Sequence, residues 1–259
     1  MIGRSCDAKP IASFVPVRII PTEHIQPQND VIINSLASEL RNSVTILRSN
    51  IQLLKAFCRR TDDLFIEESF ILCECAVNDI MRFIDCIGFL SDTSQGTLKL
   101  KKTCFDLKLF LKQVLEEIMQ LNHDPSRIQV DLSVYDLIGT DKYLLHRIMI
   151  NLLVNALKFS RSEVNLIITE HRQKLTIVVR DYGVGIPPNE IKDIFKPFAR
   201  ASNVSLITGT GLGLSIVSRA IHCMNGALYV KSIPEQGTEF HVVIPLDSVG
   251  GIKKREYYP

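Results

Sequence analysis

Apolar residues recur at steps of three and four over two stretches in the first third of the chain, which predicts two amphipathic helices. The first stretch covers about residues 29–60, and its seam is Ile33, Leu36, Leu40, Val44, Leu47, Ile51 and Leu54. The second seam is Phe70, Cys73, Val77, Ile80, Ile84 and Ile87. A helical hairpin alone leaves much of both seams in water. We therefore expect two chains to pair their hairpins into a homodimeric four-helix bundle.

After the turn-rich SDTSQG near residue 95, the pattern becomes mixed. Strands are predicted at 97–102, 127–134, 164–171, 174–181, 227–233 and 238–246, and helices at 106–121, 141–159 and 212–224. This order predicts an α+β fold class, in which a helical hairpin precedes an α/β sandwich with helices on one face of a mixed sheet. The expected domains are an irregular, proline-containing leader (1–28), the hairpin (29–94) and the sandwich (95–259).

Composition narrows the function classes. The chain of 259 residues has 30 basic and 28 acidic side chains, so it lacks the one-sided basic field of a nucleic-acid binder. The most apolar N-terminal run, 11–20, is broken by Pro16 and Arg18 and is too short to span a bilayer, so we expect no membrane span and a cytoplasmic location.

The seven cysteines are scattered without a CxxC pair, which argues against a disulfide framework and a zinc site. We expect buried free thiols. A redox or metal role for Cys73, Cys75 and Cys86 stays open.

Candidate chemistry begins in the helix predicted at 141–159. Its core stripe is Leu145, Ile148, Leu152, Ala156 and Phe159. Asn151, Asn155 and Lys158 share the adjoining face of an otherwise apolar helix. Amide oxygens are suitable ligands for Mg²⁺ and lysine suits phosphate, so the stripe has the chemistry of a nucleotide and metal site. The alternative is that these amides bond neighbouring loops.

Two glycine-containing segments follow. In KLTIVVRDYGVGIPP, Asp181 shares a strand face with Leu175, Ile177 and Val179, so its carboxylate should point inward, where an adenine amino group could satisfy it. Gly183 and Gly185 would leave room for a flat ligand; an ordinary tight turn is the alternative. In TGTGLGLSIV, glycines 209, 211 and 213 precede a helix, where free amides favour an anion such as phosphate.

Five segments in order, NLLVNALKFS, DYGVGIPP, IFKPFAR, GTGLGLSIV and QGTEFHVVIPL, resemble the ATP-binding domain of histidine kinases over residues 98–246. The resemblance implies ATP and Mg²⁺ as cofactors. It implies that Asn155 ligands Mg²⁺, that Asp181 reads adenine and that Phe195 and Phe198 anchor a mobile lid. The implied nucleotide-binding residues are Asn151, Asn155, Lys158, Phe159, Asp181, Gly183, Gly185, Ile186, Arg200, Gly209, Thr210, Gly211, Leu212, Gly213, Leu214 and Thr238.

The hairpin then resembles the dimerisation and phosphotransfer domain of the same family, and SELRNS aligns with its phosphoacceptor motif. Ser38 stands in the place of the histidine, Glu39 and Asn42 match, and Ser43 replaces the usual proline. A serine hydroxyl is a poor nucleophile without a base, and its phosphate ester is too stable to pass readily to an aspartate. We therefore expect Ser38 to be inactive as a relay.

Several functions remain open. The favoured one is a two-component signalling protein that binds ATP and Mg²⁺ as a regulatory pseudokinase or acceptor-disabled kinase, acting on a response regulator or another kinase. A variant is weak serine kinase activity. The alternatives are a response-regulator phosphatase that uses Asn42, an interaction scaffold, and, ranked last, a serine or threonine kinase of the anti-sigma type.

Overall fold

The computed structural model describes residues 17–19, 40, 44–45, 47–52, 54–55, 70, 73, 77, 80–81, 84–93, 98–121, 123–134, 136–204, 207 and 210–247. Ser38, Glu39, Asn42 and Gly209 lie outside these residues, and so do residues 29–39 and 56–60 of the first predicted hairpin helix.

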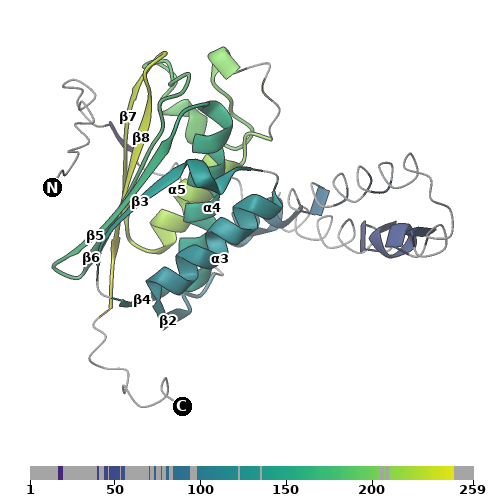
Figure 1. The fold of residues 1–259 in the computed structure, drawn as a ribbon, viewed down its shortest axis with the longest axis horizontal. Helices are drawn as coiled ribbons and strands as arrows, with labels where there is room; N and C mark the ends of the chain where they lie inside the picture. Colours follow the sequence, from purple (N-terminus) through teal and green to yellow (C-terminus); the bar gives the residue numbers. More distant parts are fainter. Residues whose placement is uncertain are drawn as a thin grey trace, which may run out of the picture.

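A six-stranded mixed sheet with the order β1-β7-β8-β6-β5-β3 forms one layer (Figure 1). Only the pair β3–β5 is parallel. The strands are β1 (Val17–Ile19), β3 (Ile128–Ser133), β5 (Val164–His171), β6 (Lys174–Arg180), β7 (Ala227–Ile233) and β8 (Gly237–Pro245). The alternating residues Val164, Leu166 and Ile168 of β5 are buried, as their period of two predicts.

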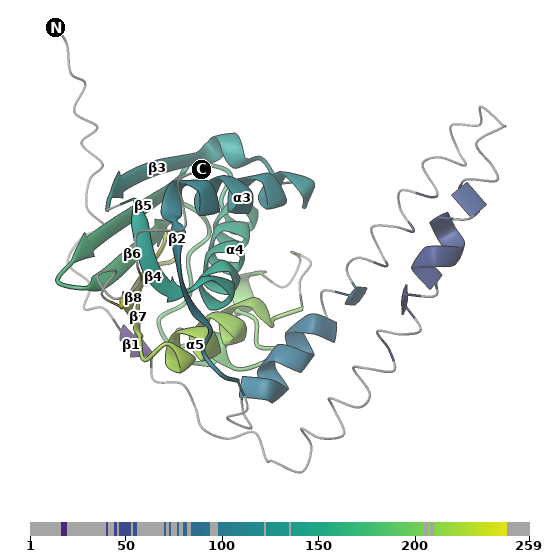
Figure 2. The same ribbon diagram turned by 90° about the horizontal axis from the view of Figure 1, so that it is seen from below.

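Helices α3 (Leu107–Gln120), α4 (Lys142–Phe159) and α5 (Gly213–Cys223) cover one face of this sheet (Figure 2). The Asp106 and Asp141 carboxylates cap α3 and α4 by accepting from the N–H groups of Leu109 and Leu144. Short 3₁₀ helices are η1 (Pro125–Arg127), η2 (Asp193–Phe195) and η3 (Ser202–Val204). The predicted α/β sandwich is confirmed.

A separate two-stranded ribbon pairs β2 (Lys102–Asp106) with β4 (Leu137–Asp141). The strand predicted at 97–102 is therefore wrong, because pairing begins only at Lys102. β4 was not predicted, since the sequence LIGTD is short and contains glycine. The carboxylate of Asp141, at the end of β4, also accepts from the N–H of Lys101 at 2.6 Å, which ties the chain entering β2 to the start of α4.

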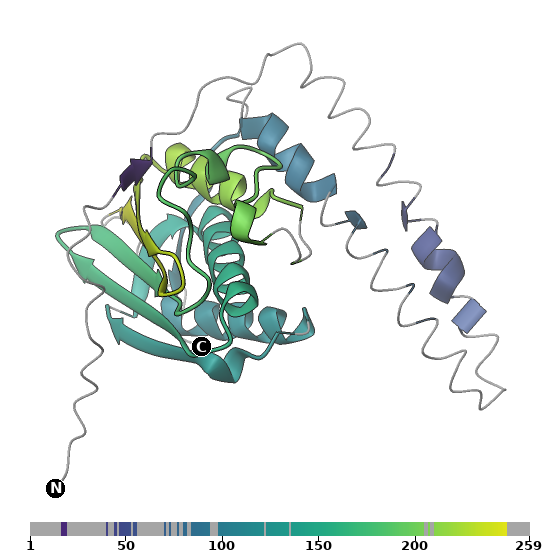
Figure 3. The ribbon, with the colours of Figure 1, turned by 90° about the horizontal axis from the view of Figure 1, so that it is seen from above.

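Helical residues precede the sandwich. Those described between 40 and 55 and between 70 and 93 are helical. Val44 and Ile51 from the first set pack with Val77 and Ile84 from the second. Residues 84–93 lie beside the sandwich (Figure 3), where Phe89 and Leu90 join its core.

The strand β1 comes from the expected leader. It pairs antiparallel with β7, with Val17 opposite Val230 and Ile19 opposite Leu228. Residues 17–19 therefore extend the edge of the sheet beside β7, which follows them about two hundred residues later in the sequence.

Candidate nucleotide site

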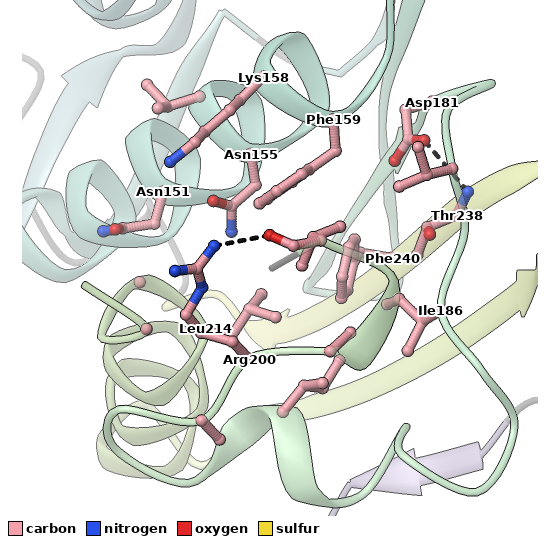
Figure 4. A pocket seen from close by; sticks show the side chains of 18 of the residues that line it. Asn151, Asn155, Lys158, Phe159, Asp181, Ile186, Arg200, Leu214, Thr238 and Phe240 are labelled. Carbon is pink, nitrogen blue, oxygen red and sulfur yellow. Dashed lines mark hydrogen bonds between the residues drawn. The ribbon is translucent and has the colours of Figure 1, made fainter. Parts of the chain in front are cut away.

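A cavity of about 570 Å³ lies between α4, the start of α5 and the ends of β6 and β8 (Figure 4). Its lining is amphipathic. Polar side chains from α4 and Arg200 lie at one end, and Asp181 and Thr238 lie at the other. Apolar side chains, both aliphatic and aromatic, lie between them. An elongated ligand with an anionic end and a flat polar end fits such a distribution.

The α4 end of the cavity carries the predicted stripe of Asn151, Asn155 and Lys158, all half-buried. The Asn151 amide nitrogen donates to the carbonyl oxygen of Arg147 at 2.7 Å, which fixes the side chain along its own helix. Burial lowers the pKa of the Lys158 amine, and the positive charge of Arg200 lowers it further. The positive charges of Lys158 and Arg200 repel each other at this end of the cavity, and an anion bound between them would relieve the repulsion.

The opposite end is built around Asp181, whose side chain is buried as the strand pattern predicts. One carboxylate oxygen accepts from the N–H groups of Gly183 at 2.9 Å and Thr238 at 3.3 Å. Burial raises the pKa of this carboxyl to about 6, and these hydrogen bonds oppose the rise. The other carboxylate oxygen accepts no hydrogen bond from the described residues, so it remains available to a donor in the cavity.

Gly183 and Gly185 shape the turn after β6 through backbone contacts. A Cβ atom on Gly183 would lie 2.1 Å from the carbonyl oxygen of Phe159, and one on Gly185 would lie 2.1 Å from that of Ile233. Gly185 also has a φ of +64°. Gly183 does not line the cavity. The missing side chain lets the turn approach the carbonyl oxygen of Phe159 at the end of α4, and the expected role of Gly183 in making room for a flat ligand stays a prediction.

The second glycine segment reaches the α4 end of the cavity. Gly211 has a φ of +72°, and a Cβ atom on Gly213 would lie 3.0 Å from Oδ1 of Asn151. Thr210, Gly211, Gly213 and Leu214 line the cavity. The side chain of Leu212 is fully buried and does not line the cavity, so its expected place in the nucleotide site stays a prediction. The N-terminus of α5 therefore points its free amides at the cationic end.

Hydrogen bonds from side chains hold the described residues between 190 and 204, several of which line the cavity. The Glu190 carboxylate accepts from both the N–H and the hydroxyl of Ser202, and the Asn203 amide donates to the carbonyl oxygens of Val184 and Gly185. Arg200 donates to the carbonyl oxygens of Val204 and Ile207.

The two aromatic residues expected to anchor this segment differ. Phe195 is buried in the core, while the side chain of Phe198 is 61% exposed. Phe198 has a φ of 65°. The expected anchoring of a mobile lid by Phe195 and Phe198 stays a prediction.

Most of the predicted nucleotide-binding residues come together around this cavity. Those that line it are Asn151, Asn155, Lys158, Phe159, Asp181, Gly185, Ile186, Arg200, Thr210, Gly211, Gly213, Leu214 and Thr238. Sequence reasoning missed Phe240, which its place two residues after Thr238 on β8 could have revealed. It also missed Cys86, which reaches the cavity from the helical region before the sandwich and carried no sequence signal.

The protein supplies only some of the ligands that a magnesium ion needs. Asn155 supplies an amide oxygen, and no group of three or more His, Cys, Asp or Glu side chains with metal-binding geometry occurs in the described part of the chain. A Mg²⁺ ion with one amide ligand, waters and nucleotide phosphates fits this set. Among the described cysteines, Cys73, Cys86, Cys104 and Cys223 form no disulfide. Cys73 is exposed, against the expectation of burial.

Comparison with known proteins identifies the sandwich. Residues 140–248 match the family described as histidine kinase-, DNA gyrase B-, and HSP90-like ATPase. The sensor protein kinase WalK of Staphylococcus haemolyticus (strain JCSC1435) is 24% identical over 88% of this chain and 38% of WalK. The signal transduction histidine-protein kinase/phosphatase MprB of Mycolicibacterium paratuberculosis (strain ATCC BAA-968 / K-10) is 28% identical over 83% of this chain and 42% of MprB. The chain thus spans well under half of either relative.

Solved structures share the fold. Full-length ShkA in complex with AMPPNP has a TM-score of 0.68 at 22% identity, over 86% of this chain and 47% of ShkA. The Acinetobacter baumannii histidine kinase AdeS has a TM-score of 0.56 at 21% identity, over 81% of this chain and 98% of AdeS. Among the described residues, no helix has both the length and the apolar run needed to cross a membrane.

Proposed function

We propose that this chain, whose residues 140–248 form a histidine kinase-type ATP-binding domain, binds ATP with Mg²⁺ as an acceptor-disabled kinase or regulatory pseudokinase of two-component signalling. One observation carries the proposal: a single cavity has Lys158 and Arg200 at one end and the buried carboxylate of Asp181 at the other. This spread of charge suits a triphosphate at the first end and an amino-bearing base at the second.

The proposed residue roles follow from this orientation. Asn151, Lys158 and Arg200 hold the phosphates together with the amides at the start of α5. Asn155 ligands Mg²⁺, which when bound would neutralise phosphate charge. The base is read by Asp181 and enclosed by Ile186 and the other apolar side chains between the two ends.

The acceptor-disabled part of the proposal rests on Ser38, where the family resemblance expects histidine. The test is incubation of the protein and of Ser38→His with Mg²⁺ and γ-labelled ATP. We expect acid-labile label on the histidine variant alone. Acid-stable label on the unchanged chain would instead make it a serine kinase, and no label on either would favour a pseudokinase that only binds ATP.

A second candidate is favoured by relatives, since MprB is named a kinase/phosphatase and Asn42 matches the motif position that the family resemblance links to dephosphorylation. In this case the partner is a phosphorylated response regulator. The assay follows loss of label from such a regulator, with Asn42→Ala as the variant expected to abolish it and Asn50→Ala as the matched control.

We also propose a homodimer through residues 29–94, the expected hairpin domain, with residues 95–259 as the ATP-binding domain. The dimer proposal is supported by the first seam, in which buried residues alternate with exposed leucines. Val44 and Ile51 are 7% and 9% exposed, while Leu40, Leu47 and Leu54 are 51%, 55% and 57% exposed at a spacing of seven. A stripe of leucines on the outside of a helix pair is suited to pack against a second copy.

A further inference from the structure

A buried serine lies directly behind the base end of the cavity. Ser232 on β7 is fully buried, and its hydroxyl accepts from the N–H of Ile186 at 2.8 Å. The same hydroxyl lies 3.1 Å from the carbonyl oxygen of Gly237 and 2.8 Å from Oγ1 of Thr238. Ser232 thus contacts the turn after β6 on one side and the start of β8 on the other without lining the cavity itself.

One assignment of donors and acceptors satisfies all of these groups. A serine hydroxyl has one proton to donate and two lone pairs to accept with. The N–H of Ile186 donates to one lone pair of the Ser232 hydroxyl, and the Ser232 proton can be donated to the carbonyl oxygen of Gly237. In this assignment Oγ of Ser232 has one lone pair left, which accepts the proton of the Thr238 hydroxyl. This arrangement satisfies all four groups, which burial strongly favours.

The consequence falls on the cavity, because Thr238 lines it. With its proton committed to Ser232, the Thr238 hydroxyl turns only lone pairs toward a ligand. The neighbouring Asp181 is joined to Thr238 by backbone hydrogen bonds of 2.9 and 3.2 Å and also offers an acceptor. Both side chains at this end therefore accept, and neither donates.

We propose that Ser232 is a specificity-determining residue, which holds the Thr238 hydroxyl as an acceptor so that the cavity selects a purine with an amino group at C6 over one with an oxo group. The inference rests on the proposed ATP binding and deepens it. An amino group at C6 donates to such acceptors, whereas an oxo group would face them lone pair to lone pair. Buried polar groups left unpaired in this way are the strong source of discrimination in binding sites.

The test compares binding of ATP with that of inosine triphosphate, in which the amino group at C6 is replaced by an oxo group. Affinities are measured for the unchanged chain, Ser232→Ala, and the control Ser218→Ala, which removes a buried serine hydroxyl of α5 away from the cavity lining. We expect Ser232→Ala to lower the ratio of the two affinities about tenfold, as loss of one directed hydrogen bond implies. Ser218→Ala should keep the ratio.

Two further measurements separate this role from a loss of folding. Inorganic tripolyphosphate binds only through the cationic end, so its affinity should be the same in Ser232→Ala and the unchanged chain. If Ser232→Ala does not fold, Ser232→Cys takes its place, because a thiol fills the space but is a weak donor and acceptor. Thr238→Val should also lower the ratio, and adding Ser232→Ala to it should lower the ratio no further.

The outcomes are distinct. An unchanged ratio in Ser232→Ala, or equal losses for both nucleotides, would overturn the role of Ser232 and leave ATP binding intact. An unchanged chain that binds ATP and inosine triphosphate equally would also overturn it. Binding of neither nucleotide by the unchanged chain would refute the proposed function and this inference with it.

Discussion

The backbone of Gly183 lies against the carbonyl oxygen of Phe159, so that a Cβ atom at residue 183 would come within 2.1 Å of that oxygen. The next residue, Val184, donates its N–H to the same oxygen at 3.2 Å. Asp181 and the end of α4 are therefore coupled through a contact between main chains. This contact leaves no room for a side chain at residue 183.

Gly183→Ala should disturb both ends of the cavity at once. Either the turn or the end of α4 must move, at a cost of about 1–3 kcal/mol in the free energy of unfolding. We expect ATP affinity to fall by about tenfold or more. The control is Gly139→Ala, whose Cβ atom would meet its nearest neighbour at 3.1 Å. Thermal unfolding and ATP titration of both variants check the prediction, and unchanged ATP binding by Gly183→Ala would contradict it.

Asp181 should make the free protein less stable as the pH rises. Its pKa is raised from 3.8 to about 6 in the folded state, so between these pH values the folded state binds more protons than the unfolded state. The stability that Asp181 contributes is thus complete below about pH 4 and is lost as the pH rises through 6. The loss is on the order of 3 kcal/mol at pH 7.

The measurement is the stability of Asp181→Asn relative to the unchanged chain from pH 4 to pH 8. We expect the variant to become the more stable of the two as the pH rises, because its amide carries no charge, while its ATP binding is lost. Asp131→Asn, which changes an exposed carboxylate of β3, serves as the control. If the stability difference between Asp181→Asn and the unchanged chain did not vary with pH, the raised pKa would be ruled out.

These sites show what the sequence predicts and where it stops. The bounds of β5 and β7 were predicted correctly, because alternation is strong over seven or eight residues. The same alternation in ALYVKSI places Ser232 on the core face with Leu228 and Val230. The sequence could therefore have predicted a buried serine that needs hydrogen-bond partners. Its partners were not predictable, because Ile186 and Gly237 reach it only through the packing of two turns.

Other features depend on contacts distant in the sequence. β1 is three residues long within a proline-containing segment, and it is a strand only because it pairs with β7. Phe198, which the family resemblance implies as a lid anchor, has a φ of 65° and is 61% exposed. Residue type predicts burial well only where a regular period fixes the direction of the side chain.

On the outer face of the sheet, Glu239 should stabilise the fold at neutral pH and lose this effect in acid. Burial acts to raise its pKa, but hydrogen bonds from His241 and Arg180 and their charges outweigh burial and lower the pKa to about 2. The Lys231 amine lies 3.3 Å from the same carboxylate. Because the folded pKa is depressed, the stabilisation is present above about pH 4.5 and disappears as the pH falls toward 2.

Glu239→Gln should therefore cost on the order of 3 kcal/mol at pH 7, and the difference from the unchanged chain should vanish near pH 2. The matched control is Glu116→Gln, since Glu116 forms only an exposed pair with Lys112 at 3.9 Å. Denaturant unfolding at several pH values provides the comparison. Equal stability of Glu239→Gln and Glu116→Gln at pH 7 would mean that the cluster contributes nothing beyond a surface pair.

The exposed leucine stripe leads to a prediction about assembly. Leu47→Glu places a charge at the middle of the stripe formed by Leu40, Leu47 and Leu54, where a second copy is proposed to pack. Because Leu47 is already 55% exposed within one chain, the substitution should leave the fold of the single chain intact. Sedimentation should then show a dimer for the unchanged chain and a monomer for Leu47→Glu, with ATP affinity preserved.

The control for assembly is Leu109→Glu, which changes a leucine of similar exposure, 57%, on α3 of the sandwich. This variant should remain a dimer, because Leu109 lies outside the proposed interface. The comparison separates a general effect of added negative charge from a specific loss of packing at the stripe. Dissociation of both variants would point to charge alone, and a persistent dimer of Leu47→Glu would place the interface elsewhere. If the stripe is the interface, Leu40→Glu and Leu54→Glu should weaken the dimer as well, because the three leucines repeat every seven residues along one side of the helix.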